Sequence, residues 1–246
     1  MTDVSPTADD APLTVVLVHG AFADASSWNG VVELLQAAGV PVTAPTNPLR
    51  GVSHDSAYIA SLLNQTSGQV LLVGHSYGGV VISNAATMAK NVAGLVYVAG
   101  LAPDEGESLM ELEGDSRDSV LTTSLVSMQY PTGEGTATAV EFAINPDYFQ
   151  DAFAADLPLA QTTVMAATQR PVSEFAFSET TGVPAWKSLP TWAVVATGDK
   201  AAGTDVVRST AERTGATIVE VDGSHMIMIS QPQAVSDVIL SAVEAV

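Results

Sequence analysis

Residues 69–90 read QVLLVGHSYGGVVISNAATMAK, and this stretch indicates the fold of the chain. An apolar, β-branched run leads into the glycine-rich segment 74–79, and small residues with helical character follow, so Ser76 falls where a strand becomes a helix. The flanking glycines allow backbone angles that a Cβ would forbid. The G-x-S-x-G pattern is weak by itself, but in this context it predicts a serine that protrudes at the carboxyl end of a strand.

Strands and helices are predicted to alternate on both sides of this stretch. Short apolar runs predict further strands at 13–18, 40–44, 92–99, 191–197 and 217–221. Amphipathic segments predict helices at 28–38, with Ser26 and Ser27 as caps, and at 53–65, 204–214 and 233–246. The alternation predicts an α/β fold with a mostly parallel central sheet of about six strands and helices on both faces. Ligands of such sheets bind at the carboxyl ends of the strands, where the turns at Gly20 and Gly74 also fall.

The strand pattern stops between about residues 101 and 189. This region reads as helices separated by breakers, at 115–129, at 136–142, from Asn145-Pro146 onward and at 157–169. We interpret it as a helical cap insertion over the crevice, within one α/β domain that spans residues 13–246. Its aromatic residues are expected mainly to hold the insertion together, with only a few of them lining a pocket.

Composition and charge exclude several classes of protein. Among 246 residues, 27 Asp and Glu against 8 Lys and Arg give a formal net charge of −19, which would repel nucleic acids and anionic membranes. Cysteine is absent, so disulfides, thiolate nucleophiles and sulfur-ligated metals are excluded. Residues 1–12 are acidic and polar, which predicts a flexible tail and no signal peptide. No apolar run reaches membrane-spanning length, so the sequence predicts a soluble and most simply cytoplasmic protein.

A serine hydroxyl needs an adjacent base to attack at neutral pH, and that base is usually a histidine oriented by a carboxylate. The chain has four histidines, and His225, in the loop after the last predicted strand, is the best candidate. His75 is interpreted as structural because neighbouring side chains diverge at a sharp turn, and His19 because its ring can brace the first glycine turn. His54 is expected to be solvated at the start of a helix.

Asp199 is the predicted carboxylate partner of that base. It directly follows a buried strand and precedes His225, which gives the order serine, aspartate, histidine expected of hydrolases with a nucleophile elbow. Asp104, after the fourth strand, remains the alternative carboxylate. Asp205 and Asp222 are interpreted as a helix-start residue and a turn former.

Acyl transfer also requires hydrogen-bond donors for the developing oxyanion. The backbone N–H of Tyr77, at the start of the helix after Ser76, is one predicted donor. The second is expected from the turn after the first strand, at Ala21 or Phe22, and the close approach that Gly20 permits favours Ala21.

Several short segments carry a resemblance to a known superfamily. They are His19-Gly20-Ala21, Ser26-Ser27-Trp28, Gly74 to Gly79, Gly198-Asp199-Lys200 and Gly223-Ser224-His225, together with 102–108 and 184–187. On these residues the chain resembles the α/β-hydrolase superfamily, and most closely the cofactor-free branch that includes plant methylesterases, hydroxynitrile lyases and related bacterial carboxylesterases. The resemblance implies the α/β-hydrolase fold and catalysis without a cofactor or a metal.

Two departures from the lyases favour hydrolysis. The lyases carry a lysine after the catalytic histidine and a threonine in the first glycine turn, where this chain has Met226 and Gly20. The leading antiparallel strands of the family are also expected to be missing, because the first predicted buried strand begins only at Leu13.

Together these observations predict a serine esterase that cleaves a small neutral or apolar carboxylic ester through an acyl-enzyme, with Ser76, His225 and Asp199 as its triad. The acidic surface disfavours anionic substrates, and an apolar cap favours an apolar acyl or alkyl group. Another cofactor-free reaction on the same triad, such as carbon–carbon cleavage or perhydrolysis, is one alternative. A ligand-binding receptor on the same fold is the other.

Overall fold

The computed structural model describes residues 12–133 and 135–246. Within them, six strands form the central sheet in the order β2-β1-β3-β4-β8-β9. Their bounds are β1 (Thr14–Val18), β2 (Val42–Thr43), β3 (Val70–His75), β4 (Val92–Val98), β8 (Thr191–Ala196) and β9 (Thr217–Val221). All neighbouring strands in this sheet pair in parallel, which confirms the predicted sheet. The predicted tail at residues 1–12 lies, apart from Pro12, outside the described residues.

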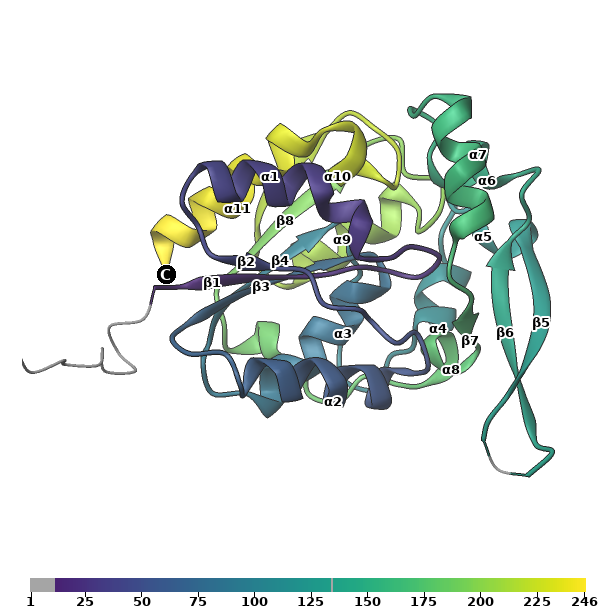
Figure 1. Cartoon of the computed structure of the whole chain (residues 1–246), viewed down its shortest axis with the longest axis horizontal. Coiled ribbons are helices and arrows are strands. Elements are labelled where there is room, and N and C mark those ends of the chain that lie inside the picture. The colour runs from purple at the N-terminus through teal and green to yellow at the C-terminus, as the bar shows by residue number, and fades with distance from the viewer. Residues whose placement is uncertain (1–11, 134) are drawn as a thin grey trace, which may run out of the picture.

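Helices cover both faces of this sheet because its inner strands are buried on both sides. Figure 1 shows α1 (Asn29–Ala37) and α11 (Pro232–Ala245) over one face, and α2 (Val52–Leu63) and α3 (Tyr77–Ala85) over the other. The other helical elements around the sheet are α9 (Thr204–Arg213), α10 (Ile227–Ser230) and the 3₁₀ turns Ala25–Trp28, Ala86–Met88 and Ala185–Lys187. Each fully buried Val, Leu or Ile side chain contributes about 1.5–3 kcal/mol to the hydrophobic stabilisation of this layered core.

The start of α1 differs from the sequence prediction. The 3₁₀ turn Ala25–Trp28 precedes it and is capped by Asp24, whose carboxylate accepts a hydrogen bond from the Ser26 N–H at 2.7 Å, whereas α1 itself has no side-chain cap. The predicted caps Ser26 and Ser27 were therefore wrong. The Ser26 hydroxyl itself donates to Asp24 at 2.6 Å and the Ser27 hydroxyl donates to the Asp24 carbonyl, and neither oxygen accepts a capping hydrogen bond from α1.

The insertion between β4 and β8 forms a cap that is only partly helical. Its helices are α4 (Leu109–Gly114), α5 (Leu121–Ser124), α6 (Phe149–Phe153), α7 (Leu159–Thr168) and α8 (Phe175–Ser178). Its strands β5 (Leu125–Pro131), β6 (Thr138–Ile144) and β7 (Val172–Ser173) form a separate antiparallel sheet. Figure 1 shows this cap at the end of the central sheet to which β1 points.

The helix predicted at 136–142 was wrong, because β6 occupies most of it, and the helix predicted at 115–129 is present only as α5, since β5 begins at Leu125. Val126, Met128 and Tyr130 recur at every second position, which is the period of a strand. Gly133 and Gly135 have positive φ angles of 87° and 60°, which allow the chain to reverse between the two strands. The helix predicted at 157–169 is confirmed by α7, and the one predicted to begin at Asn145 begins later, as α6.

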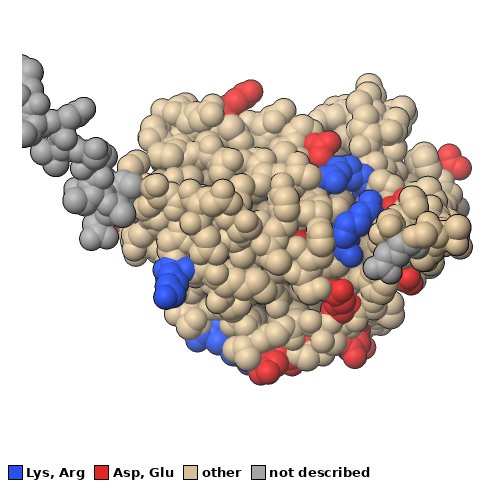
Figure 2. Space-filling view, turned by 60° about the horizontal axis from the view of Figure 1, so that its bottom comes forward, with Lys and Arg blue, Asp and Glu red and all other residues tan. Residues whose placement is uncertain are grey.

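Few cations stand free on the surface. Most of the described Arg and Lys side chains pair with a carboxylate: Arg50 with Glu141, Arg117 with Asp205, Lys187 with Asp104, Arg208 with Glu220 and Arg213 with Glu107. Figure 2 shows a face on which uncharged residues predominate and charged groups are scattered. In the part of the chain that is described, no helix is long and apolar enough to cross a membrane.

Candidate active site

Ser76 stands between the end of β3 and the start of α3 with φ 53° and ψ −126°. A positive φ at a residue that carries a Cβ is strained by about 1–3 kcal/mol and persists only where its surroundings hold it. Here the Ser76 N–H donates to the Val98 carbonyl at 3.3 Å, and the Ser76 carbonyl accepts hydrogen bonds from the N–H groups of Gly79 at 2.8 Å and Leu101 at 3.3 Å. The sharp turn predicted for this serine is therefore present, and it leaves Ser76 only 9% exposed.

Glycines allow the first turn of the chain to approach this serine. A Cβ at Gly20 would lie 2.7 Å from the Ser76 Cβ and 2.8 Å from the His75 carbonyl oxygen. A Cβ at Gly78 would collide with the Val18 carbonyl oxygen at the end of β1. The turn after β1 and the turn after β3 are thus in direct contact, and Ala21 lies next to that contact.

His225 and Asp199 form a buried pair. The His225 Nδ1 lies 2.7 Å from Asp199 Oδ2, and each residue is only 1% exposed. The other carboxylate oxygen, Oδ1, accepts hydrogen bonds from the N–H groups of Ala201 at 2.9 Å and Ala202 at 3.0 Å. The alternative carboxylate, Asp104, instead contacts Lys187 Nζ at 2.5 Å on the surface. The structure therefore joins His225 to Asp199.

His75 links the serine turn to the loop that carries His225. Its Nε2 lies 3.0 Å from the His225 carbonyl oxygen, and the two ring centroids are 4.7 Å apart. Burial, reinforced by the neighbouring His225, lowers the pKa of His75 well below its usual value, so the ring is neutral and its Nε2–H donates. This contact spans 150 residues of sequence and brings the turn that carries Ser76 against the loop that carries His225.

Among the described residues, no hydrogen bond joins the Ser76 hydroxyl to the His225 ring. Such bonds between a nucleophile and its base often tighten only when the substrate is in place. The structure therefore brings the serine and the histidine to one site without joining them directly.

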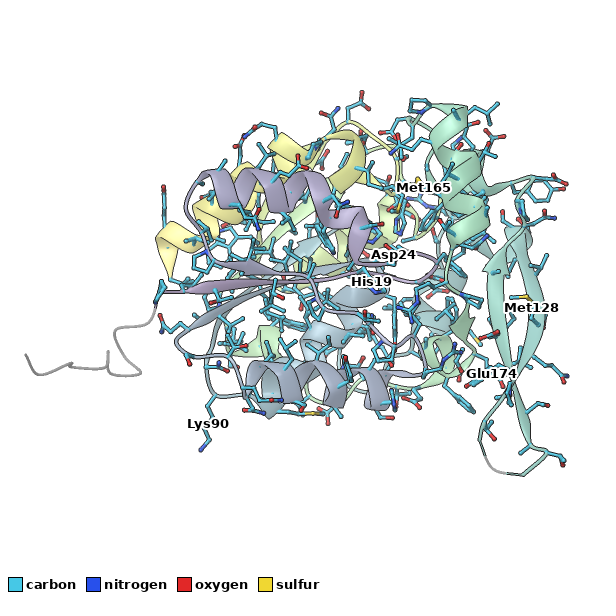
Figure 3. The ribbon with its side chains drawn as sticks, viewed as in Figure 1. His19, Asp24, Lys90, Met128, Met165 and Glu174 are labelled. Atoms are coloured by element: carbon cyan, nitrogen blue, oxygen red, sulfur yellow. The ribbon has the colours of Figure 1, made fainter. Side chains whose placement is uncertain are left out.

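His19 and His54 lie as the sequence predicted. The His19 Nδ1 donates to the Gly20 carbonyl at 2.9 Å, and its Nε2 accepts a hydrogen bond from the Asn47 N–H at 2.9 Å. Burial lowers the pKa of His19 to about 4, so the ring braces the turn as a neutral group. Figure 3 shows His19 at the end of β1 that faces the cap. The His54 side chain is 62% exposed.

The predicted oxyanion donors are close to Ser76. Tyr77 is the first residue of α3, where the backbone N–H has no acceptor within the helix. Its hydroxyl donates to the buried Asp55 carboxylate at 2.8 Å, which holds the side chain away from the N–H. Ala21 is buried and follows Gly20, and Phe22 next to it has a positive φ of 60°.

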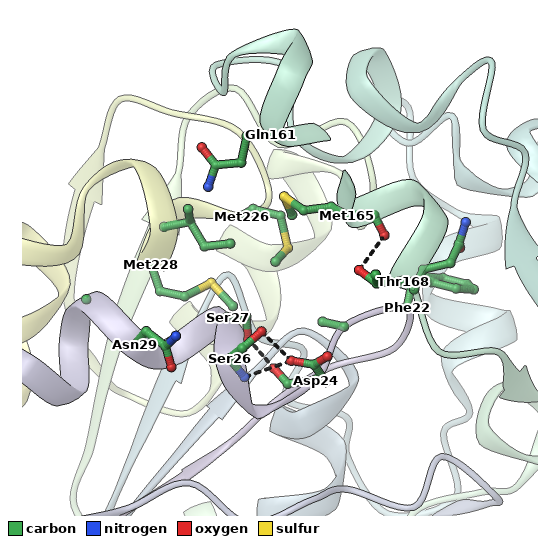
Figure 4. A pocket seen from close by; sticks show the side chains of 14 residues that line it. Phe22, Asp24, Ser26, Ser27, Asn29, Gln161, Met165, Thr168, Met226 and Met228 are labelled. Atoms are coloured by element: carbon green, nitrogen blue, oxygen red, sulfur yellow. Dashed lines mark hydrogen bonds between the residues drawn. The ribbon is translucent and has the colours of Figure 1, made fainter. Parts of the chain in front are cut away.

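A pocket of about 330 Å³ lies between cap and core beside these residues. Figure 4 shows Met165 of α7, Met226 and Met228 around it. Phe22 also lines it, as do polar side chains including Asp24, Ser26, Gln161 and Thr168. None of the predicted catalytic residues lines this pocket, and it meets them only through their chain neighbours Phe22, next to Ala21, and Met226, next to His225. Flexible thioether side chains adapt to apolar groups of varied shape.

Two cap residues that contact the loop of His225 were not singled out from the sequence. Asp156 accepts hydrogen bonds from the N–H of Ser224, at 3.0 Å, and from its hydroxyl. The ring of Phe153 lies 5.2 Å, between centroids, from the ring of His225. No local signal marks these residues, because Asp156 and Ser224 are 68 residues apart. Across residues 12–133 and 135–246 there is no cluster of three His, Asp or Glu side chains that could hold a metal ion.

Glu113 of α4 adds a second carboxyl group near Asp199. Burial and the negative charge of Asp199 raise the pKa of Glu113 to about 8, from an ordinary value of 4.5. Between these two pH values the folded protein keeps a proton that the unfolded chain releases, so the free energy of unfolding falls as pH rises. At pH values below 4.5 both states are protonated and nothing is lost.

We therefore expect Glu113→Gln to be as stable as the parent near pH 4 and more stable near pH 9, by about 5 °C in Tm or more. The measurement is thermal unfolding of both proteins across this pH range. Glu105→Gln, which alters an exposed carboxylate of the same segment, is the control and should follow the parent. Identical pH profiles for Glu113→Gln and the parent would show that Glu113 is ionised in the folded protein.

Comparison with known protein families supports the fold independently. A family profile described as "Alpha/beta hydrolase family" matches residues 15–238. The match extends from the second residue of β1 into α11, and so includes the central sheet and the cap.

Individual relatives share about a quarter to a third of their residues with this chain over the matched regions. A carbendazim hydrolyzing esterase of Nocardioides sp. (strain SG-4G) is 34% identical over 110 residues, which are 39% of this chain and 46% of that protein. A pyrethroid hydrolase of Sphingobium wenxiniae is 29% identical over 158 residues, 58% of this chain and 55% of that protein. The chain thus spans about half the length of these two relatives. An alpha-hydroxynitrile lyase of Arabidopsis thaliana is 26% identical over 253 residues, with coverage of 90% and 93%.

Solved structures show the same architecture. Polyneuridine aldehyde esterase superposes with a TM-score of 0.78 at 22% identity, covering 94% of this chain and 99% of the other. An extracellular alpha/beta-hydrolase from a Paenibacillus species superposes with a TM-score of 0.76 at 19% identity, with the same coverage. At these identities the likeness establishes the fold.

Proposed function

Because the chain belongs to the alpha/beta hydrolase family, we propose that it is a serine hydrolase that cleaves a small neutral or apolar carboxylic ester through an acyl-enzyme. The observation that carries the proposal is the buried contact of 2.7 Å between His225 and Asp199, on a loop that also touches the strained turn at Ser76. A histidine oriented by a carboxylate is the base that a serine hydroxyl requires.

Acylation begins when Ser76 attacks the ester carbonyl and His225 Nε2 takes the hydroxyl proton. The N–H groups of Tyr77 and Ala21 bind the negative oxygen of the tetrahedral intermediate. His225 then gives its proton to the departing alcohol, and the acyl group remains on Ser76. Asp199 holds the imidazole with its Nδ1–H toward the carboxylate and stabilises the charged ring.

Deacylation repeats these roles with water as the nucleophile. His225 takes a proton from the water as it attacks the acyl-enzyme, and the same two N–H groups bind the second oxyanion. The intermediate collapses to the carboxylic acid, and His225 returns the proton to Ser76. No redox group or external reductant is needed for either half of the cycle.

The expected substrate class follows from the surroundings of the site. Met165, Met226 and Met228 give the neighbouring pocket an apolar wall that suits an acyl or alkyl group. The formal net charge of −19 disfavours anionic substrates. Relatives named as an esterase, a pyrethroid hydrolase and a methylesterase support the same reaction class.

Lyase chemistry is less well supported, although one relative is named an alpha-hydroxynitrile lyase. The threonine that such lyases carry in the first glycine turn has no room here, because a Cβ at Gly20 would lie 2.7 Å from the Ser76 Cβ. The lysine that follows their catalytic histidine is replaced by the buried Met226. Both differences favour hydrolysis over cyanide transfer.

A panel of p-nitrophenyl esters with lengthening acyl chains tests the proposal. We expect hydrolysis of the esters with short and medium acyl chains. For esters whose acyl group carries a free, negative carboxylate, kcat/KM should fall by about tenfold or more. Labelling of Ser76 by a fluorophosphonate should accompany turnover. Labelling without hydrolysis of any ester would favour carbon–carbon cleavage or perhydrolysis, and an inert serine with tight ligand binding would favour a receptor.

A further inference from the structure

The loop that carries His225 is anchored at successive residues. The Gly223 carbonyl accepts a hydrogen bond from the Gly198 N–H at 2.9 Å, and the His225 carbonyl accepts one from His75 at 3.0 Å. Both of these anchors come from the core of the molecule. The anchor on the residue between them, Ser224, comes from the cap.

That anchor is the carboxylate of Asp156, in the turn between α6 and α7. It receives both the backbone N–H of Ser224, at 3.0 Å, and its hydroxyl. Hydrogen bonds to an ionised carboxylate are about twice as strong as those between neutral groups. Burial alone would raise the pKa of Asp156, but the hydrogen bonds from Ser224 hold it below its usual value, which keeps the carboxylate ionised.

The loop is built to admit this carboxylate. A Cβ at Gly223 would collide with Ile227 Cδ1 and lie 2.8 Å from Asp156 Oδ2, so any other residue at that position would crowd both the Ile227 side chain and the carboxylate. Gly223 has a negative φ, a backbone conformation that any residue can adopt. Close approach, rather than unusual backbone angles, therefore accounts for glycine at this position.

The same cap segment also packs on the imidazole. Phe153, three residues before Asp156, has its ring centroid 5.2 Å from that of His225 and 6.1 Å from that of Phe22. Phe153 is buried, and Phe149 packs against it at 5.2 Å. Segment 149–156 thus touches the ring of His225 directly and the backbone of its neighbour through Asp156.

We propose that Asp156 is a positioning residue, which through Ser224 holds His225 in the orientation needed to take the Ser76 proton and so makes the cap a part of the catalytic machinery. The role of His225 as the base rests on the proposed function. The hold of Asp156 on the loop does not. A displaced cap would release Ser224 and leave the base poorly aligned, since a misplacement of about 1 Å can cost on the order of 100-fold in rate.

The test compares Asp156→Ala, Asp156→Asn and Asp151→Ala with the parent, using kcat and KM for a short p-nitrophenyl ester. We expect Asp156→Ala to lower kcat by about 10- to 100-fold with KM within about twofold. Asp156→Asn keeps the shape and one oxygen to accept the Ser224 N–H, while its N–H₂ can donate to the Ser224 hydroxyl, so it should recover kcat to within about threefold of the parent. Asp151→Ala removes an exposed carboxylate of α6 and should behave as the parent.

A purely structural tie between cap and core would lower Tm without changing kcat. The proposal is overturned if folded Asp156→Ala turns over like Asp151→Ala, or if Asp156→Asn is as impaired as Asp156→Ala, because charge rather than hydrogen bonding would then matter.

A second readout separates this proposal from the proposed function. The proton between His225 Nδ1 and Asp199, 2.7 Å apart, is expected to give a far-downfield NMR resonance in the parent, which should broaden or vanish in Asp156→Ala and persist in Asp156→Asn and Asp151→Ala. Failure of the parent to cleave any ester would refute the esterase while leaving this comparison intact. An unchanged resonance in Asp156→Ala would refute the positioning role whatever the reaction.

Discussion

Ser76→Ala is expected to lower kcat/KM for an activated ester by about 10⁴-fold or more while leaving the protein folded. The hydroxyl lost is the group that forms the acyl-enzyme. The strained backbone at Ser76 is held by hydrogen bonds to Val98, Gly79 and Leu101 that involve only main-chain atoms, so alanine can occupy the same turn. The measurement is steady-state hydrolysis of p-nitrophenyl butyrate together with fluorophosphonate labelling.

Ser61→Ala, which removes an exposed serine hydroxyl of α2, is the matched control and should retain parental turnover and labelling. Residual turnover in Ser76→Ala can come from the oxyanion donors and from binding alone. Hydrolysis near the parental rate in this variant would mean that another residue is the nucleophile.

Asp199→Asn is expected to lower kcat by about 10³- to 10⁴-fold with little change in KM. Oδ1 of Asp199 accepts two backbone N–H groups, from Ala201 and Ala202, so the amide oxygen of asparagine must take that place. The amide N–H₂ would then face His225 Nδ1, now 2.7 Å from Oδ2. A donor there forces the ring into the tautomer with its proton on Nε2, which cannot accept the proton of Ser76.

Asp104→Asn is the control for this variant, because Asp104 is the other carboxylate that the sequence left open. Its contact with Lys187 on the surface gives no route to the imidazole, so kcat should stay within about twofold of the parent. The assignment of the carboxylate would be reversed if Asp104→Asn were the impaired protein and Asp199→Asn the active one.

The central sheet was predictable because its signals are local. The apolar runs that became β1, β3 and β8 are short, rich in β-branched residues and bounded by turn residues. These three features distinguish a strand buried on both faces from a buried helix. The position of Ser76 followed from the glycines around it. These features depend on residues within one strand and one turn.

The cap was less predictable because its strands lack such strong local signals. In β5 the apolar residues do recur at the strand period, but Val126 and Met128 remain exposed on the small sheet. A strand of this kind is stabilised by its partner rather than by burial of one face, so its local sequence is a weak signal. The predicted helix cap at Ser26 and Ser27 was misplaced because these serines lie inside a 3₁₀ turn that Asp24 caps.

The sequence by itself determined the parallel α/β sheet, the strained turn at Ser76 and a short set of candidates for base and carboxylate, because glycine content and hydrophobic period act over a few residues. Only the tertiary structure decided the partners. Asp199 meets His225 across 26 residues, Asp156 meets Ser224 across 68, and His75 meets His225 across 150. Such contacts depend on the path of the whole chain around its core, which no local pattern encodes.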